Sequence, residues 1–219
     1  MKIPLSDRLR ACAEFIAVGS RVADIGCDHG YLGIHLLKNG IASSMIESDV
    51  NEAPLQSALH NAHKFGVADK MTFYLSDGAN NIPRDFDTLV CAGMGADTMI
   101  HILENAPWLQ DCHYKLILQC QSKTPMLRKY LSDHGWHIAE EAITRDGKFL
   151  YSVMCIHYQP DAPRLTPGQC YISPAMLRTG SPELTEYYTR IMEGLRLAVA
   201  HKDDQEKKAI VEELEQLKL

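Results

Sequence analysis

A chain of 219 residues with 46% apolar residues is long enough for one full domain and an appendage. No apolar run approaches the ~20 residues that cross a bilayer, and the first residues lack the apolar core and cleavage site of a secretory signal, so we expect a cytoplasmic protein. The net charge of −6 does not by itself indicate nucleic-acid binding, and seven cysteines and ten histidines show no zinc-ligand spacing, so we expect free thiols and no metal.

The first two thirds of the chain alternate between helix and strand patterns. Apolar residues on one face predict a first helix that is capped by Ser6 and ends near Gly19. Buried strands are then expected at 22–25, 44–49, 71–75, 88–92 and 115–119, and helices between and after them at 31–37, 54–65, 96–104 and 124–134. Two strands, at 136–141 and 149–157, are expected to form an antiparallel hairpin across Arg145-Asp146-Gly147. This order is typical of the α/β, Rossmann-like sheet of a class I methyltransferase.

The composition changes at 159–163, where prolines interrupt the apolar pattern, and another breaker follows at Pro174. From Glu183 apolar residues recur at spacings of three and four, and they do so again at 210–217 after the polar break 201–204. We therefore expect an N-terminal domain at 1–158, then a linker and a helical, coiled-coil-like hairpin at 159–219. This appendage either shields part of the first domain or binds substrate, and the pattern favours neither.

The stretch 21–32 predicts a strand, a tight glycine turn and the start of a helix. Gly26 and Gly30 let the backbone approach a ligand, and Asp24 at the end of the strand can pair with a cationic amino group. Asp28 occupies the position of the second glycine in the dinucleotide fingerprint G-x-G-x-x-G, where a carboxylate would repel a pyrophosphate. A cationic nucleoside such as S-adenosyl-L-methionine fits this turn better.

Carboxylates also follow the next two strands. Asp49 ends the second strand, where it can accept both ribose hydroxyls, and Asp77-Gly78 follows the third, where a carboxylate can bond the adenine amine. Alone, each aspartate is more often a helix or turn cap than a ligand. Together they favour a cofactor site, because ligands bind outside the carboxyl ends of such strands. The other residues expected to bind the cofactor are Cys27, His29, Tyr31, Ala92, Gly93 and Met94.

Four segments resemble the TrmK-type bacterial tRNA (adenine-N1)-methyltransferases, which act on adenine 22 of tRNA. The segments are 23–32, 46–58, 92–95 and 116–119, within a match that runs from Leu5 to about Met154. The resemblance implies a Rossmann-like N-terminal domain, a helical C-terminal domain, S-adenosyl-L-methionine as donor and tRNA as substrate. It also implies that Asp28 is the catalytic carboxylate.

This chain departs from the family at the end of the fifth strand. Members usually have Leu-Gln-Pro-Asn there, whereas this chain has Leu118-Gln119-Cys120-Gln121, so we expect an altered base pocket. Ala96 stands where glycine is common and Gly30 where alanine is common, and both leave the turns feasible. The residues expected to bind substrate are Gln119, Cys120, Gln121, Arg128 and Arg145.

The expected mechanism follows from the chemistry of adenine. N1 carries an in-plane lone pair, so it can attack a sulfonium methyl group when the two are held in line. Asp28, oriented by His29, would stabilise the positive charge of the product or take the N6 proton; the alternative is that Asp28 only binds the cofactor. Gly93 and Met94 are expected to wall the slot for a flipped base.

Basic residues are denser after Lys115, which favours an electrostatic RNA-binding face spread over both domains, although a solvated surface is the alternative for each one. The candidates are Lys123, Arg128, Lys129, Arg145, Lys148, Arg164, Arg178, Arg190 and Arg196.

These observations predict an S-adenosylmethionine-dependent methyltransferase that acts on N1 of an adenine in tRNA. Two alternatives stay open: a class I methyltransferase for a small molecule or a protein side chain, and a non-catalytic protein that binds the cofactor or RNA. The oligomeric state is open, with a monomer favoured.

Overall fold

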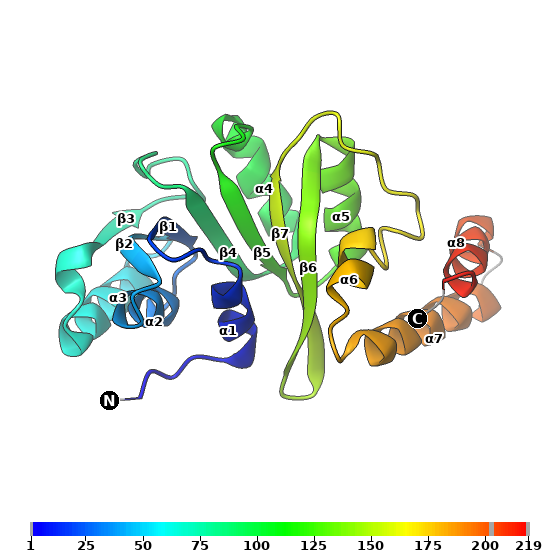
Figure 1. The fold of residues 1–219 in the computed structure, drawn as a ribbon, viewed down its shortest axis with the longest axis horizontal. Helices are drawn as coiled ribbons and strands as arrows, with labels where there is room; N and C mark the ends of the chain where they lie inside the picture. The colour runs from blue at the N-terminus through cyan, green and yellow to red at the C-terminus, as the bar shows by residue number, and fades with distance from the viewer. Residues whose placement is uncertain (1, 202–203, 218–219) are drawn as a thin grey trace.

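The computed structural model describes residues 2–201 and 204–217 and contains a seven-stranded sheet with the order β3-β2-β1-β4-β5-β7-β6 (Figure 1). The strands are β1 (Ser20–Ile25), β2 (Ala42–Asp49), β3 (Met71–Leu75), β4 (Thr88–Met94), β5 (Lys115–Cys120), β6 (Trp136–Asp146) and β7 (Phe149–Tyr158). The first five strands pair in parallel, and β7 runs antiparallel to both β5 and β6. The expected class I methyltransferase sheet is therefore confirmed.

Helices cover both faces of the sheet, because the central strands are apolar on both sides. One face packs on α1 (Asp7–Glu14), α2 (Tyr31–Lys38) and α3 (Glu52–Phe65), and the other on α4 (Ala96–Asn105) and α5 (Thr124–Asp133). Short 3₁₀ turns lie at Ala68–Lys70 and Pro107–Leu109. This three-layer arrangement leaves the carboxyl ends of the parallel strands free to form a site.

Four local predictions differ from the structure, and the first is that α1 ends at Glu14, before the expected end near Gly19. The hydroxyl of Ser6 caps no backbone N–H and is buried without a hydrogen-bond partner among the described residues. The strand β4 continues to Met94, because Met94 pairs with Cys120 after a bulge, where the sequence indicated a turn. The hairpin turn lies at 147–148, since Asp146 still pairs with Phe149.

The C-terminal part contains one helix more than the sequence predicted. Pro174 does not break the structure but begins α6 (Pro174–Thr179), because Ser173 accepts a hydrogen bond from the N–H of Met176 and proline is favoured in a first turn. The two expected helices are α7 (Leu184–His201) and α8 (Gln205–Glu215).

In the C-terminal part, α8 folds back on α7, and the Tyr188 hydroxyl donates to the carbonyl of Leu214. Both helices lie beyond the β6 edge of the sheet (Figure 1). Within the expected polar break 201–204, residues 202 and 203 lie outside the described residues. The division of the chain at 158 stays a prediction.

Candidate functional site

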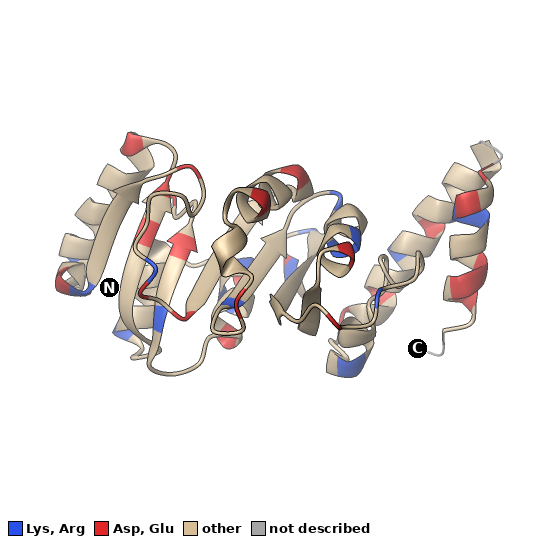
Figure 2. Cartoon of the chain, turned by 90° about the horizontal axis from the view of Figure 1, so that it is seen from above, with Lys and Arg blue, Asp and Glu red and all other residues tan. Residues whose placement is uncertain are grey.

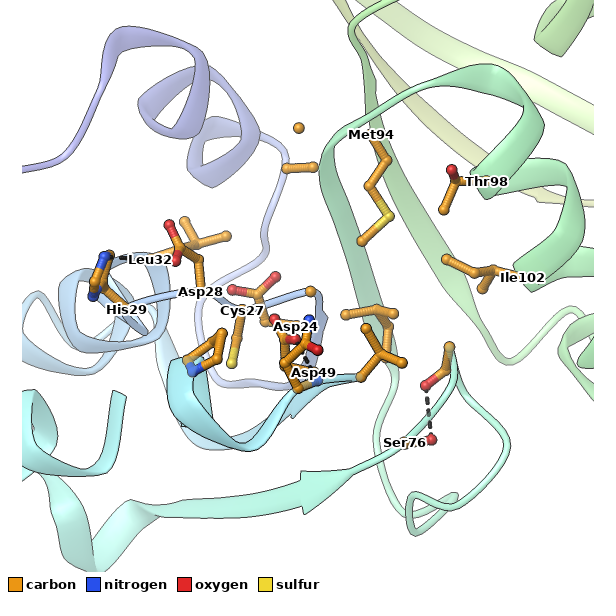
Figure 3. A pocket seen from close by; sticks show the side chains of 18 of the residues that line it. Asp24, Cys27, Asp28, His29, Leu32, Asp49, Ser76, Met94, Thr98 and Ile102 are labelled. Atoms are coloured by element: carbon orange, nitrogen blue, oxygen red, sulfur yellow. Dashed lines mark hydrogen bonds and ion pairs between the residues drawn. The ribbon is translucent and has the colours of Figure 1, made fainter. Parts of the chain in front are cut away.

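A cavity of about 480 Å³ lies at the carboxyl ends of the central parallel strands (Figure 3). Its lining includes twelve residues that the sequence placed at the site: Asp24, Gly26, Cys27, Asp28, His29, Tyr31, Asp49, Asp77, Gly78, Ala92, Gly93 and Met94. Figure 3 shows Asp24 and Asp49 side by side, with Asp28 and His29 on one flank and Met94, Thr98 and Ile102 on the other. The topology thus brings the ends of separate strands to one cavity.

The turn after β1 is attached to the neighbouring strand by its backbone. The N–H groups of Gly26 and Cys27 both donate to the carbonyl of Ser48, at 2.7 and 3.0 Å. Gly26 has φ +74°, and a side chain there would collide with the methyl group of Met94. The left-handed backbone therefore favours glycine at this position, and the end of the Met94 side chain fills the space next to it.

Gly30 is the one expected cofactor residue that does not line the cavity. Its φ is +69°, and a Cβ would lie 2.9 Å from the Cβ of Ala58 in α3. Gly30 thus lets the start of α2 approach α3, which is a packing role. On the same side, the amide of Asn61 donates to the carbonyl of His29 at 3.1 Å and holds the turn against α3.

Asp28 has a backbone conformation that side-chain-bearing residues seldom adopt, with φ +52°. Its side chain is 75% exposed, and its Oδ1 lies 3.6 Å from Nε2 of His29. It caps no helix, since Gly30 occupies the N-cap position of α2 without any side-chain hydrogen bond. Strained residues of this kind concentrate at functional sites, because the surrounding structure must hold them there.

Asp24 and Asp49 form the buried floor of the acidic site, with exposed fractions of 4% and 9%. Burial, then the charge of Asp49, then the charge of Asp28 raise the pKa of Asp24 to about 7. Asp24 pairs with no cation among residues 2–201 and 204–217. A bound cation would relieve both the burial cost and the mutual repulsion.

Glu47 lies behind Asp24 on β2 and is completely buried. Burial, and then the charge of Asp24, raise the pKa of Glu47 well above the ordinary value. Its carboxyl group fills the space that a side chain at Gly33 would take. The pKa of the Cys27 thiol is raised as well, first by burial and then by Glu47, so Cys27 is not a nucleophile.

Asp77 follows β3 and lines the cavity. Its side chain is 65% exposed and lies 3.7 Å from Nε2 of His101. The hydroxyls of Ser76 and Ser48 both donate to the carbonyl of Gly78, at 3.0 and 3.3 Å, and fix the turn. Asp77 therefore has a fixed backbone and an accessible carboxylate.

Gln119 of β5 organises the opposite wall of the cavity from a buried position. Its Oε1 accepts from the N–H of Gly93 at 3.0 Å and from the guanidinium of Arg8 at 3.2 Å. Gly93 has φ +82°, and Arg8 lies directly against it. Gln119 has an exposed fraction of 0%, so it positions cavity residues rather than lining the cavity.

The other expected substrate residues have different surroundings. Cys120 is buried, and its Sγ contacts the carbonyl of Ser122. Gln121 is exposed next to the cavity wall, where its N–H donates to the carbonyl of Met94 at 2.8 Å. Neither Cys120 nor Gln121 lines the cavity.

The prediction that Arg128 binds substrate is wrong, because its side chain is completely buried. Its guanidinium donates to Glu141 at 2.7 Å and to the carbonyl of Cys170 at 2.8 Å, so it joins α5, β6 and the segment before α6. Arg145 lies outside the cavity, is 41% exposed, and pairs with Glu186 of α7 at 2.5 Å.

The expected basic face is divided by carboxylates. Ion pairs join Lys123 to Asp97, Lys129 to Asp133, Arg145 and Arg190 to Glu186, and Arg196 to Glu215. Figure 2 shows acidic and basic positions mixed along the C-terminal helices, while acidic positions gather at neighbouring strand ends. Basic residues in the second half of the chain therefore do not form one continuous positive face.

Several residues of the cavity were not predicted from the sequence, above all Arg8, which contacts Gln119 across 111 residues of the chain. No local motif signals such a contact. Val50 also lines the cavity and was missed, although its position directly after Asp49 could have indicated this. The other missed lining residues are Leu9, Ile25, Leu32, Asn51, Pro54, Ser76, Thr98 and Ile102.

Within the described residues no helix is long and apolar enough to cross a membrane, and no three His, Cys, Asp or Glu residues are grouped to hold a metal ion.

Residues 5–154 match the family model of a methyltransferase domain. The chain is 30% identical to the tRNA (adenine(22)-N(1))-methyltransferase of Bacillus subtilis over 154 residues, which is 70% of this chain and 65% of that protein. The aligned part thus spans about two thirds of that relative.

Two crystal structures show the same fold over nearly the whole chain. The Bacillus subtilis tRNA methyltransferase TrmK has a TM-score of 0.82 at 25% identity, covering 97% of this chain and 95% of that one. The Streptococcus pneumoniae protein Sp1610, in complex with S-adenosyl-L-methionine, has a TM-score of 0.81 at 27% identity, covering 93% and 98%. The likeness includes the C-terminal helices.

Proposed function

The chain belongs to the methyltransferase-domain family, among the TrmK-type tRNA (adenine-N1)-methyltransferases, and we propose that it methylates N1 of an adenine in tRNA. S-adenosyl-L-methionine is the methyl donor, as the complex of the pneumococcal neighbour supports. A location in the cytoplasm and action as a monomer belong to the same proposal.

One observation carries the proposal: a buried carboxylate, Asp24, opens into a cavity without a cationic partner among the described residues, and its pKa is about 7. A donor with an ammonium and a sulfonium group supplies the missing positive charge. A dinucleotide would instead bring a pyrophosphate next to Asp28, at a cost in repulsion. The carboxylates that line the cavity therefore fit S-adenosyl-L-methionine better than a dinucleotide.

The acidic residues divide the work of holding the donor. Asp24 pairs with the amino group, and Asp49 accepts the ribose hydroxyls, since it ends the strand next to the first turn. Asp77 accepts a hydrogen bond from the adenine amine, because its carboxylate lines the cavity and is accessible. Gly26 lets the backbone come close to the ligand.

In the reaction, the lone pair of adenine N1 forms the new N–C bond, the S–C bond breaks, and its electron pair stays on sulfur. The bound donor supplies the activated methyl group. Asp28 stabilises the positive charge that appears on the adenine ring, or takes the N6 proton, while His29 at 3.6 Å orients its carboxylate. Gly93 and Met94 form one wall of the slot for the flipped base. The hydrogen bond from the N–H of Gly93 to Gln119 holds this wall in place.

The decisive experiment is to incubate the purified chain with labelled S-adenosyl-L-methionine and unmodified tRNA and then to map the modified nucleotide. Label in N1-methyladenine at position 22 is the expected result. Label in another nucleotide corrects the site, and no label in RNA moves the substrate to a small molecule or a protein side chain. No binding of the donor in calorimetry would leave only a non-catalytic role.

A further inference from the structure

The hairpin of β6 and β7 extends past the sheet edge at which the cofactor cavity lies. Cys120, the last residue of β5, pairs with Ser152 of β7, so residues 149–151 continue beyond the end of β5. At about 3.3 Å per residue they project roughly 10 Å past that edge. Asp146 of this projection lies 3.6 Å from the guanidinium of Arg8, which lines the cavity. Arg8 therefore connects the hairpin tip to the lining of the cavity, although no residue of the tip is itself part of that lining.

Phe149 is a large apolar side chain at this tip and is 52% exposed. Its ring packs against Tyr151 with centroids 6.1 Å apart, and Nζ of Lys148 lies 5.3 Å from its centroid. Phe149 and Asp146 are paired across the hairpin, so their side chains leave the sheet on the same face, where Asp146 meets Arg8. The molecule thus presents a flat aromatic ring beside the cavity mouth.

Helix α7 contacts the hairpin next to its tip. Arg190 of α7 donates to the backbone carbonyl of Lys148 at 3.3 Å, and Glu186 of α7 pairs with Arg145 of β6. These contacts occupy the two arginines, whereas Lys148 forms no ion pair with any residue that the structure describes. The tip therefore combines a backbone held by α7, an exposed ring, and a cation that contacts this ring but forms no ion pair among the described residues.

We propose that Phe149 is a stacking platform for an unpaired nucleobase next to the target adenine, and that Lys148 contacts the adjoining phosphate. This inference rests on the proposed function, in which tRNA is the substrate. Moving an adenine into the cavity separates it from its stacked neighbours, and an aromatic ring at the mouth replaces the lost stacking. Stacking on a ring tolerates any base, while a lysine next to it recognises the backbone charge.

The test compares Phe149→Ala and Phe149→Tyr with a matched control, Val18→Ala. Val18 is 83% exposed and lies between α1 and β1, at the opposite edge of the parallel strands. For each variant the Kd for unmodified tRNA, the Kd for S-adenosyl-L-methionine, and KM and kcat of methyl transfer are measured.

Phe149→Ala should raise the Kd and KM for tRNA about tenfold and leave the Kd for the methyl donor unchanged. Phe149→Tyr should restore the wild-type values, since tyrosine stacks as well, and Val18→Ala should not differ from wild type. In a separate variant, Lys148→Ala should reduce the slope of log K against log salt by about one.

Wild-type tRNA affinity in Phe149→Ala overturns the stacking proposal, and so does a failure of tyrosine to restore binding. Methyl transfer by the unchanged chain reports separately on the proposed function. If that transfer is intact while Phe149→Ala binds tRNA normally, only the stacking inference falls. If the unchanged chain does not bind tRNA, both fall.

Discussion

Buried carboxylates occur in two regions of the sheet, and they are neutralised in different ways. In the acidic rim, defined as Asp24, Asp28 and Asp49, Asp24 is 4% exposed and has no cation among residues 2–201 and 204–217. On β6, Glu141 is 0% exposed and accepts hydrogen bonds from Arg128 and Ser173. A buried acid whose partners come from the chain supports the fold, whereas Asp24, which faces the cavity without a cation among the described residues, marks a place for a ligand.

The largest effect is expected from removal of the cation that pairs with the buried Glu141. Arg128→Ala should lower the free energy of unfolding by about 3–5 kcal/mol, because it leaves the charge of Glu141 buried without its counter-ion. Denaturant unfolding with circular dichroism measures the change. The double variant Arg128→Met, Glu141→Leu should recover most of the loss, and a double variant as unstable as the single one would show that packing rather than charge is at stake.

Substitution of Asp28, the exposed residue of the acidic rim, should lower the rate of methyl transfer rather than the stability of the fold. Asp28→Ala should lower kcat by about 100-fold or more while the Kd for S-adenosyl-L-methionine changes little, since general acid–base and charge-stabilising groups contribute on this scale. Single-turnover methyl transfer and calorimetry separate the two effects. A parallel loss of donor binding would show that Asp28 is a cofactor ligand only.

Asp24, a buried residue of the acidic rim, should make the affinity for S-adenosyl-L-methionine depend on pH. The free protein holds a proton on Asp24 below pH 7 because its pKa is about 7, and a cationic ligand favours the ionised form. The affinity for S-adenosyl-L-methionine should therefore fall by up to about tenfold per pH unit as the pH drops below 7. Calorimetry between pH 5.5 and pH 8.5, roughly the range around that pKa, tests this. The matched variant Asp24→Asn should bind weakly at every pH, and a retained pH slope would assign the proton to another group.

The smallest effect is expected where an acid and its partners are both exposed. Glu186 pairs with Arg145 and Arg190, yet its side chain is 43% exposed, so water replaces much of what the pairs supply. Glu186→Ala should leave Tm unchanged within error, in contrast to Arg128→Ala. A clear fall in Tm would show that this surface network fixes the hairpin to α7 more tightly than its exposure indicates.

The sequence predicted most of the fold because local patterns decide it. The strand Met71–Leu75 was predicted with its observed bounds, and the other parallel strands within a few residues, since buried strands between glycine turns have a strong local signature. The helix at Pro174 was missed because the proline was interpreted as a break, although a serine followed by a proline is also a local signal for a helix start. The hydrogen bond from the N–H of Met176 to Ser173 shows that this proline begins a helix.

The amino-acid sequence by itself determined the acidic rim and its turn, because strands that alternate with helices bring their carboxyl ends to one edge of a sheet. Tertiary structure decided which charges find partners far along the chain. Arg128 and Arg145 look alike in the sequence, yet one is buried against Glu141 and the other lies at the surface against Glu186. Arg8 and Gln119 meet across 111 residues. Such contacts depend on how distant elements pack, and burial then sets whether a charge stabilises the fold or awaits a ligand.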